Sequence, residues 1–267
     1  MKKIFAMLLA LTMILGMTSA MAEAADASLQ AILDKKTFVL GLDDSFPPMG
    51  YRNEDNEVVG FDIDVATAVC AKLGVELVVQ PIDWAAKELE LSTGNIDCIW
   101  NGMSITPERE KSMAMSFPYL NNQMIFYTKT GAGIAAQGDL AGKKIAVQSG
   151  SYAEDLLGGD YAELAATFEV LAFDDYLMAL MDLQNGGVDA VLMDLVVGDY
   201  KIKGMGATDL EAAFSLADDN YGIGFRQADI ALRDKVQEVL VELKKDGTLA
   251  EISTQWFGSD ISVVPAE

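Results

Sequence analysis

Apolar positions along the chain change their spacing repeatedly, from short unbroken runs to intervals of three and four residues. The runs at 37–42 and 75–80 predict strands, whereas the apolar spacing within 62–73 predicts a helix. The same alternation continues through an expected helix at 85–93 and an expected buried strand at 96–100. This β-α-β-α-β order is typical of an α/β protein with mainly parallel sheets.

A second series of alternating elements follows an extended stretch at 123–128. Its strand at 144–147 leads into a helix that begins at Ser151, with Glu154 three residues later as in a capping box. The later expected elements are strands at 168–171, 190–193 and 221–225, and helices at 175–184, toward Lys201, at 232–243 and near 249–256. The repeated pattern implies a second lobe with a sheet of its own.

The first 22 residues have the three parts of a secretory signal peptide. Lys2 and Lys3 precede an apolar run at 4–17, and small residues follow as far as Ala22. The apolar run is shorter than the roughly 20 residues that span a bilayer, so we expect cleavage rather than a membrane anchor. No cysteine lies near the cut, so no lipid anchor is evident. We expect the mature chain, from Glu23, to be periplasmic or secreted.

Composition narrows the function. The chain has 267 residues, 51% of them hydrophobic, which is enough for one or two packed domains. Its 19 Lys and Arg against 41 Asp and Glu give a net charge of −22, and this argues against nucleic acid as a partner. It contains no histidine and only two cysteines, so histidine-based catalytic triads and the usual zinc sites cannot be built. We expect no metal and no cofactor.

The two cysteines both lie in apolar patterns. Cys70 falls on the apolar stripe of the helix at 62–73, and Cys98 falls inside the buried run at 96–100. We favour two buried free thiols, although a disulfide between them stays open at this point because it depends on their separation in space.

Adjacent carboxylates are weak evidence for acid–base catalysis in so acidic a chain. Pairs such as Asp218-Asp219 are interpreted as solvated turns or caps. Asp62, directly before a helical apolar pattern, is expected to be an N-terminal helix cap.

Four segments, at 41–49, 60–64, 101–109 and 148–151, occur in an order and spacing that together are specific. With Asp83-Trp84 and the stretch at 221–224, they make residues 38–257 resemble the polar amino-acid family of ABC-importer solute-binding proteins. The resemblance implies the two-lobed α/β fold of type II periplasmic binding proteins, in which a ligand lies between lobes that close over it.

This fold has two crossing segments between its lobes, and here they are expected near 120–123 and 217–221. Lobe 1 would then comprise residues 23–120 and 220–267, and lobe 2 residues 121–219. Lobe 1 is therefore expected to be discontinuous in sequence.

The resemblance also implies a pair of charged ligand contacts. Arg109 would bind an α-carboxylate in bidentate fashion, and Asp194, from the other lobe, would accept an α-ammonium. From their sequence positions alone, Arg109 could equally be a solvated residue between Glu108 and Glu110, and Asp194 a cap of the next helix.

The remaining expected contacts surround these two charges. Asn101, Gly102, Ser104 and Ser151 would add hydrogen bonds. Phe46 and Trp84 would enclose the ligand's side chain, with ordinary core packing as the alternative. Asp43 would meet the far end of that side chain, which favours a neutral polar or basic ligand. Gln148 and Tyr152 are expected ligand contacts at positions where the chain departs from its relatives.

The resulting hypothesis is a monomeric, non-enzymatic protein that captures an L-amino acid and delivers it to the membrane permease of an ABC importer. Two alternatives remain at this point. One is an enzyme resembling the cyclohexadienyl dehydratases, which use the same fold, and the other is a periplasmic ligand sensor.

Overall fold

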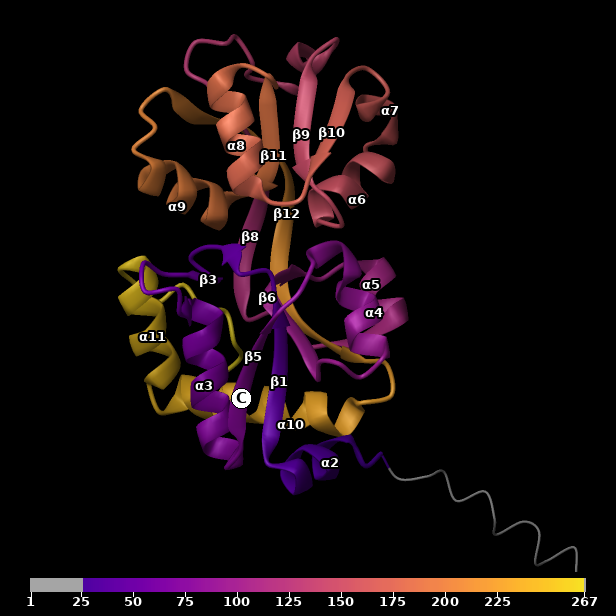
Figure 1. The fold of residues 1–267 in the computed structure, drawn as a ribbon, viewed down its shortest axis with the longest axis vertical. Helices are drawn as coiled ribbons and strands as arrows, with labels where there is room; N and C mark the ends of the chain where they lie inside the picture. Colours follow the sequence, from indigo (N-terminus) through magenta and orange to yellow (C-terminus); the bar gives the residue numbers. More distant parts are fainter. Residues whose placement is uncertain (1–25, 267) are drawn as a thin grey trace, which may run out of the picture.

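The computed structural model describes residues 26–266, which form two α/β lobes stacked along the long axis of the molecule (Figure 1). This confirms the expected fold class. The expected signal peptide lies outside the described residues and stays a prediction. Within residues 26–266, no helix is long and apolar enough to cross a membrane.

Lobe 1 is built on three parallel strands. Strand β1 (Thr37–Leu42) pairs with β5 (Glu76–Pro81) on one side and with β6 (Cys98–Ser104) on the other. Its helices are α2 (Ser28–Lys35), α3 (Phe61–Leu73), α4 (Lys87–Ser92), α5 (Pro107–Ser112), α10 (Ile230–Lys245) and α11 (Thr248–Phe257), with a 3-10 turn η1 (Trp84–Ala86). Short strands β2 (Ser45–Phe46), β3 (Gly50–Arg52), β4 (Val58–Val59) and β7 (Met113–Met115) complete it.

Lobe 2 repeats the plan. Strand β9 (Lys144–Gln148) lies between β10 (Glu169–Phe173) and β11 (Ala190–Asp194), and all three are parallel. The helical segments are η2 (Gln137–Leu140), α6 (Tyr152–Gly158), α7 (Ala162–Ala165), α8 (Tyr176–Asn185) and α9 (Leu195–Met205).

Two long antiparallel strands, β8 (Leu120–Lys129) and β12 (Leu210–Arg226), run from one lobe into the other (Figure 1). They join both lobes into one strand order, β10-β9-β11-β8-β12-β6-β1-β5. The expected crossing segments face each other here, with Leu120 opposite Tyr221 and Gln123 opposite Asp218. The sequence indicated only the last part of β12, because the polar residues at 218–220 interrupt its apolar pattern.

Both cysteines are buried and free, which confirms the favoured expectation. Cys70 belongs to the apolar face of α3, and Cys98 to β6, in which every residue is buried. Burial raises the pKa of both thiols, so they remain protonated at neutral pH.

The contact between α9 and β8 in lobe 2 requires a glycine. A Cβ at Gly198 would lie 2.3 Å from the ring of Tyr127, whose hydroxyl donates to Leu195 O and to Asp199. We expect Gly198→Ala to lower the free energy of unfolding by about 1–3 kcal/mol through overpacking. Urea denaturation measures this change.

The same helix supplies the control. A Cβ at Gly204 would meet no atom within 4 Å, so Gly204→Ala should raise stability by about 0.5–1 kcal/mol through helix propensity alone. Equal stability of the two variants would contradict the packing argument.

Candidate functional site

A small cleft lies where the two lobes meet. Residues from both lobes line it, namely Phe46, Trp84, Asn101, Gly102, Ser104, Arg109, Gln148, Ser151, Tyr152, Tyr176 and Asp194. Ten of the eleven residues expected from the sequence are therefore brought together.

The end of β6 forms the floor of the cleft on lobe 1. Gly102 has a φ of +56° in this strand, and a Cβ there would lie 2.9 Å from the ring of Phe46. The backbone can therefore approach the cleft only because this residue is glycine.

Asp62 holds Gly102 in place from beneath. Its Oδ2 accepts hydrogen bonds from Gly102 N at 2.8 Å and from the hydroxyl of Tyr119 at 3.0 Å. The expectation that Asp62 caps a helix is wrong: Gly60 is at the N-cap of α3, and the Asp62 side chain is fully buried. Burial raises the pKa of Asp62 to about 7.

Arg109 enters the cleft from the first turn of α5. Thr106 caps this helix by accepting from Arg109 N, and Pro107 occupies its first position. The guanidinium donates to Ser104 O at 2.9 Å and to Asp155 Oδ2, in lobe 2, at 3.3 Å. Only 4% of the Arg109 side chain is exposed, so the solvated alternative does not describe this residue. A guanidinium has five N–H donors, which leaves several for a ligand.

Asp194 faces the cleft from lobe 2, at the end of β11. It is buried, and its Oδ1 accepts hydrogen bonds from Asn122 Nδ2 and from the hydroxyl of Tyr221, both at 2.7 Å. Although it precedes α9, its side chain makes no capping hydrogen bond. Burial and the neighbouring charge of Asp219 raise the pKa of Asp194 to about 7.

Gln148 and Asp43 meet across the two lobes. Gln148 Nε2 donates to Asp43 Oδ2 at 2.7 Å and to Asp174 O at 3.1 Å. The other oxygen of Asp43 accepts from the backbone and the hydroxyl of Ser45. Asp43 is the one expected residue that does not line the cleft, because both of its oxygens are used by neighbours.

Aromatic rings enclose the rest of the cleft. Phe46 and Trp84 come from lobe 1, and Tyr152 and Tyr176 from lobe 2. The rings of Phe46 and Tyr176 face each other across the lobes, with 6.1 Å between their centroids. Ser151 lies beside Tyr152, where its hydroxyl caps α6 by accepting from Glu154 N.

Sequence reasoning missed Tyr176, Asn122 and Asp219. Tyr176 was hidden in an apolar helical pattern, although the capping residue Asp175 before it marks where α8 begins. Asn122 and Asp219 lie opposite each other on the crossing strands, and no local pattern distinguishes them from exposed polar residues.

Two buried lysines form hydrogen bonds between the lobes, one donating from lobe 1 to lobe 2 and the other from lobe 2 to lobe 1. Lys87 Nζ, in lobe 1, donates to Gly150 O of lobe 2 at 2.8 Å. Lys201 Nζ, in lobe 2, donates to Ser45 O of lobe 1 at 2.6 Å. Burial, together with the charge of Arg109, lowers the pKa of Lys87 to about 8, and burial lowers that of Lys201. The structure is therefore a closed arrangement of the lobes.

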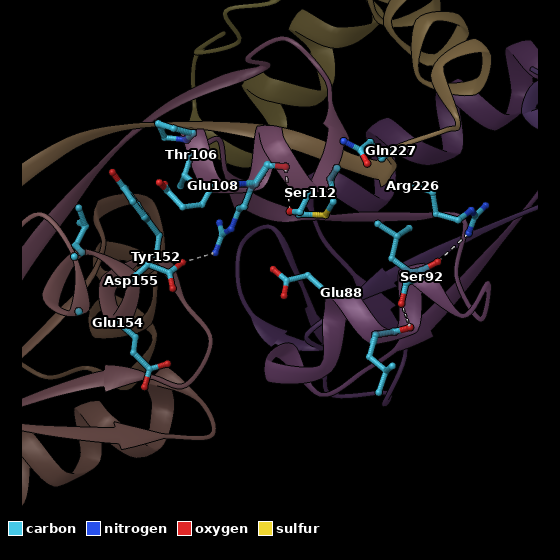
Figure 2. Close-up of a pocket in the computed structure, with 18 of the residues that line it drawn as sticks. Glu88, Ser92, Thr106, Glu108, Ser112, Tyr152, Glu154, Asp155, Arg226 and Gln227 are labelled. Carbon is cyan, nitrogen blue, oxygen red and sulfur yellow. Dashed lines mark hydrogen bonds and ion pairs between the residues drawn. The ribbon is translucent and has the colours of Figure 1, made fainter.

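A larger open groove adjoins the cleft along α4, α5 and α6 (Figure 2). It shares Arg109 and Tyr152 with the cleft, and carboxylates of Glu88, Glu154 and Asp155 border it. The dashed line at Asp155 in Figure 2 marks its ion pair with Arg109. The negative charge of these carboxylates attracts cations toward the gap between the lobes.

Comparison with known proteins places the chain among established relatives. Residues 38–259 match the model of the bacterial extracellular solute-binding proteins, family 3. The chain belongs to this family. The match spans both lobes and includes every residue that lines the cleft.

Individual relatives agree with the family match. The L-cystine-binding protein TcyJ of Escherichia coli (strain K12) is 28% identical over 95% of this chain and 94% of its own length. The ABC transporter arginine-binding protein 1 of the same strain is 30% identical over 81% of this chain and 89% of its own. A crystal structure of an ABC uptake transporter substrate binding protein from Streptococcus pneumoniae with bound histidine superposes with a TM-score of 0.86, at 35% identity over 90% of this chain and 99% of that one.

The lysine contacts generate a prediction about closure. We expect Lys201→Met to lower the population of the closed form, because it removes a charged hydrogen bond that exists only when the lobes meet and is worth about 1.5–3 kcal/mol. Small-angle X-ray scattering should then show a larger radius of gyration. Lys203→Met, an exposed lysine on the same helix, should leave the scattering unchanged. If Lys201→Met scatters like the unaltered protein, the contact does not hold the lobes.

Proposed function

We propose that this protein captures a free L-amino acid in the cleft between its lobes and presents the closed form to the permease of an ABC importer. One observation carries the proposal. A buried guanidinium on lobe 1 and a buried carboxylate on lobe 2 line the same cleft, and no ion pair joins Arg109 to Asp194 among the described residues. An amino acid carries the two opposite charges that would satisfy both at once.

The electrostatics favour a neutral polar or basic side chain on the ligand. The lining of the cleft holds one carboxylate, Asp194, and one guanidinium, Arg109, while the nearby Lys87 and Lys201 donate to backbone carbonyls. A ligand side chain with a further carboxylate would find no second cation in this lining, whereas a neutral polar side chain needs none and a basic one would lie near Asp43. The names of the relatives, which include arginine- and cystine-binding proteins and one bound to histidine, support the same class.

In this proposed function, the protein works outside the cytoplasm as a monomer, and the ATPase of the importer is a separate chain. The family description and the importer relatives support this placement. Whether the closed form also reaches a signalling receptor is a question of partners, which co-purification with membrane proteins addresses.

An enzymatic role on this scaffold has one observation in its favour and one against it. An elimination resembling that of a cyclohexadienyl dehydratase needs a cleft acid of raised pKa, and Asp194 fits that description. It also needs a second cation for a second carboxylate. Lys87 is one candidate, but it donates to the carbonyls of Trp84 and Gly150 and does not line the cleft. Incubation with prephenate or arogenate tests this alternative, since turnover would contradict a purely binding role.

The ligand itself is found by a thermal-shift screen of refolded, ligand-free protein against the common L-amino acids. A ligand that binds only the folded form raises the melting temperature, by an amount that grows with its concentration above Kd. We expect shifts from basic or neutral polar amino acids and none from aspartate or glutamate. A screen without any positive amino acid would overturn the proposal.

Arg109→Ala tests the carboxylate contact. We expect a loss of affinity of at least a hundredfold by calorimetry, because a buried charged hydrogen bond is lost and the ligand's carboxylate is left unpaired. Arg233→Ala, which removes an arginine on the surface of α10, is the matched control and should bind normally. Unchanged affinity in Arg109→Ala, in protein that still melts cooperatively, would reject the assignment.

A further inference from the structure

Two buried carboxylates share one amide nitrogen at the hinge. Asn122 Nδ2 donates to Asp194 Oδ1 at 2.7 Å and to Asp219 Oδ2 at 2.8 Å. Asn122 and Asp219 are directly opposite each other on the crossing strands β8 and β12, while Asp194 ends β11 in lobe 2. The two acids are therefore held close together where the lobes pivot.

No cation neutralises this pair. Among the described residues, neither Asp194 nor Asp219 forms an ion pair with a lysine or arginine, and each is only 5% exposed. Burying two adjacent negative charges without a counterion costs free energy. Such a pair therefore commonly keeps one proton, which removes one of the two charges. Burial accordingly raises the pKa of Asp219 as well as that of Asp194.

The arginine and the tyrosines around the pair keep the same charge near pH 7. Two other buried groups near the cleft, Asp62 and Lys87, have pKa values moved by burial to about 7 and about 8, but they form their hydrogen bonds elsewhere, with Gly102 and Tyr119 and with Trp84 O and Gly150 O. The charge of Arg109, on α5, lowers the pKa of Asp219, but the guanidinium donates its hydrogen bonds to Ser104 O and Asp155 rather than to the pair. The facing tyrosines are Tyr127 on β8, Tyr152 on α6, Tyr176 on α8 and Tyr221 on β12, and burial raises the pKa of each, so they stay neutral. Of the groups that hydrogen-bond to the pair, none titrates near pH 7, so the two carboxylates are the expected source of a released proton.

Asp219 also sets the polarity of the cleft wall. Ser104 Oγ donates its one proton to Asp219 Oδ2 at 2.9 Å, so it offers only lone pairs to the cleft. Asp194 uses Oδ1 for both of its side-chain hydrogen bonds, which leaves Oδ2 for a ligand. Both cleft-lining groups are therefore set to accept hydrogen bonds from a cation.

We propose that Asp219 is a positioning residue which, together with Asp194, holds one proton while the cleft is empty and releases it to solvent when the ligand's ammonium binds Asp194. The inference rests on the proposed function, because the arriving cation is the ammonium of the captured amino acid. The ammonium keeps its own protons. Its positive charge replaces that of the released proton, so the net charge of the two carboxylates and their cation is the same before and after binding. Capture is thereby coupled to pH.

Calorimetry with the amino acid found in the screen tests the coupling. At pH 6, the binding enthalpy should differ between buffers of different ionisation enthalpy by an amount that approaches one released proton per ligand. Affinity should rise about tenfold per pH unit between pH 5 and 6, below the pH at which the ligand's ammonium titrates. Affinity that is independent of pH, without proton release, would overturn the inference and leave the proposed function standing.

Substitutions assign the proton to its source. Asp219→Asn should move the midpoint of proton release to lower pH, because Asp194 loses its charged neighbour, whereas Asp218→Asn, an exposed acid one residue away, should behave like the unaltered protein. Asp62→Asn tests the other buried acid near the cleft. A midpoint that is unmoved in Asp219→Asn, or release that disappears in Asp62→Asn, contradicts the assignment.

A measurement on the ligand-free protein separates this inference from the proposed function. Carbon-13 NMR of aspartate-labelled protein should show a carboxyl titration near neutral pH that moves to lower pH in Asp219→Asn. If no amino acid binds even at pH 8, the proposed function is wrong, and this titration still decides whether the pair holds a proton. If no carboxyl group titrates near neutral pH, the inference is overturned.

Discussion

The structure depends on keeping the buried guanidinium of Arg109 and the buried carboxylate of Asp194 on separate lobes, with no ion pair between them among the described residues. Arg109 is anchored by Ser104 O and Asp155, and Asp194 by Asn122 and Tyr221, so each is fixed while its remaining hydrogen-bonding capacity faces the cleft. Burial makes each unsatisfied charge expensive, and a ligand that meets both makes closure favourable. Under the proposed function, ligand binding would add to the polar contacts that already join the lobes in the closed form.

The contacts between the lobes are consistent with a reversible closure. They include the hydrogen bonds of Lys87 to Gly150 O, Lys201 to Ser45 O and Gln148 to Asp43, besides the contact between the rings of Phe46 and Tyr176. Each of these groups can be hydrated when the lobes separate, so opening leaves few unsatisfied atoms. Burying two lysines without a carboxylate in contact also limits the stability of the closed form, as their lowered pKa values indicate.

The crossing strands both connect the lobes and supply side chains that contact the cleft residues. β8 and β12 stay paired through the hinge, from Leu120 opposite Tyr221 to Met124 opposite Ala217. The same segment supplies Asn122, Asp219 and Tyr221, which hydrogen-bond to the cleft residues Asp194 and Ser104. The charge state of the cleft and the geometry of the pivot are therefore set by the same few residues.

The sequence by itself determined the features that depend on local order. Alternating strand and helix patterns predicted the α/β class, and Ser151 with Glu154 predicted where α6 begins. The resemblance of four segments to a known family implied eleven ligand contacts, of which ten line one cleft. Only the tertiary structure decided how distant polar groups pair. Asp62 lies beneath Gly102 rather than at a helix end, Asp43 is taken up by Gln148, and Asp219 is buried beside Asp194 rather than solvated. These partners are separated by 40 to 105 residues or lie on different strands, and local periodicity reports only on neighbours within a few positions.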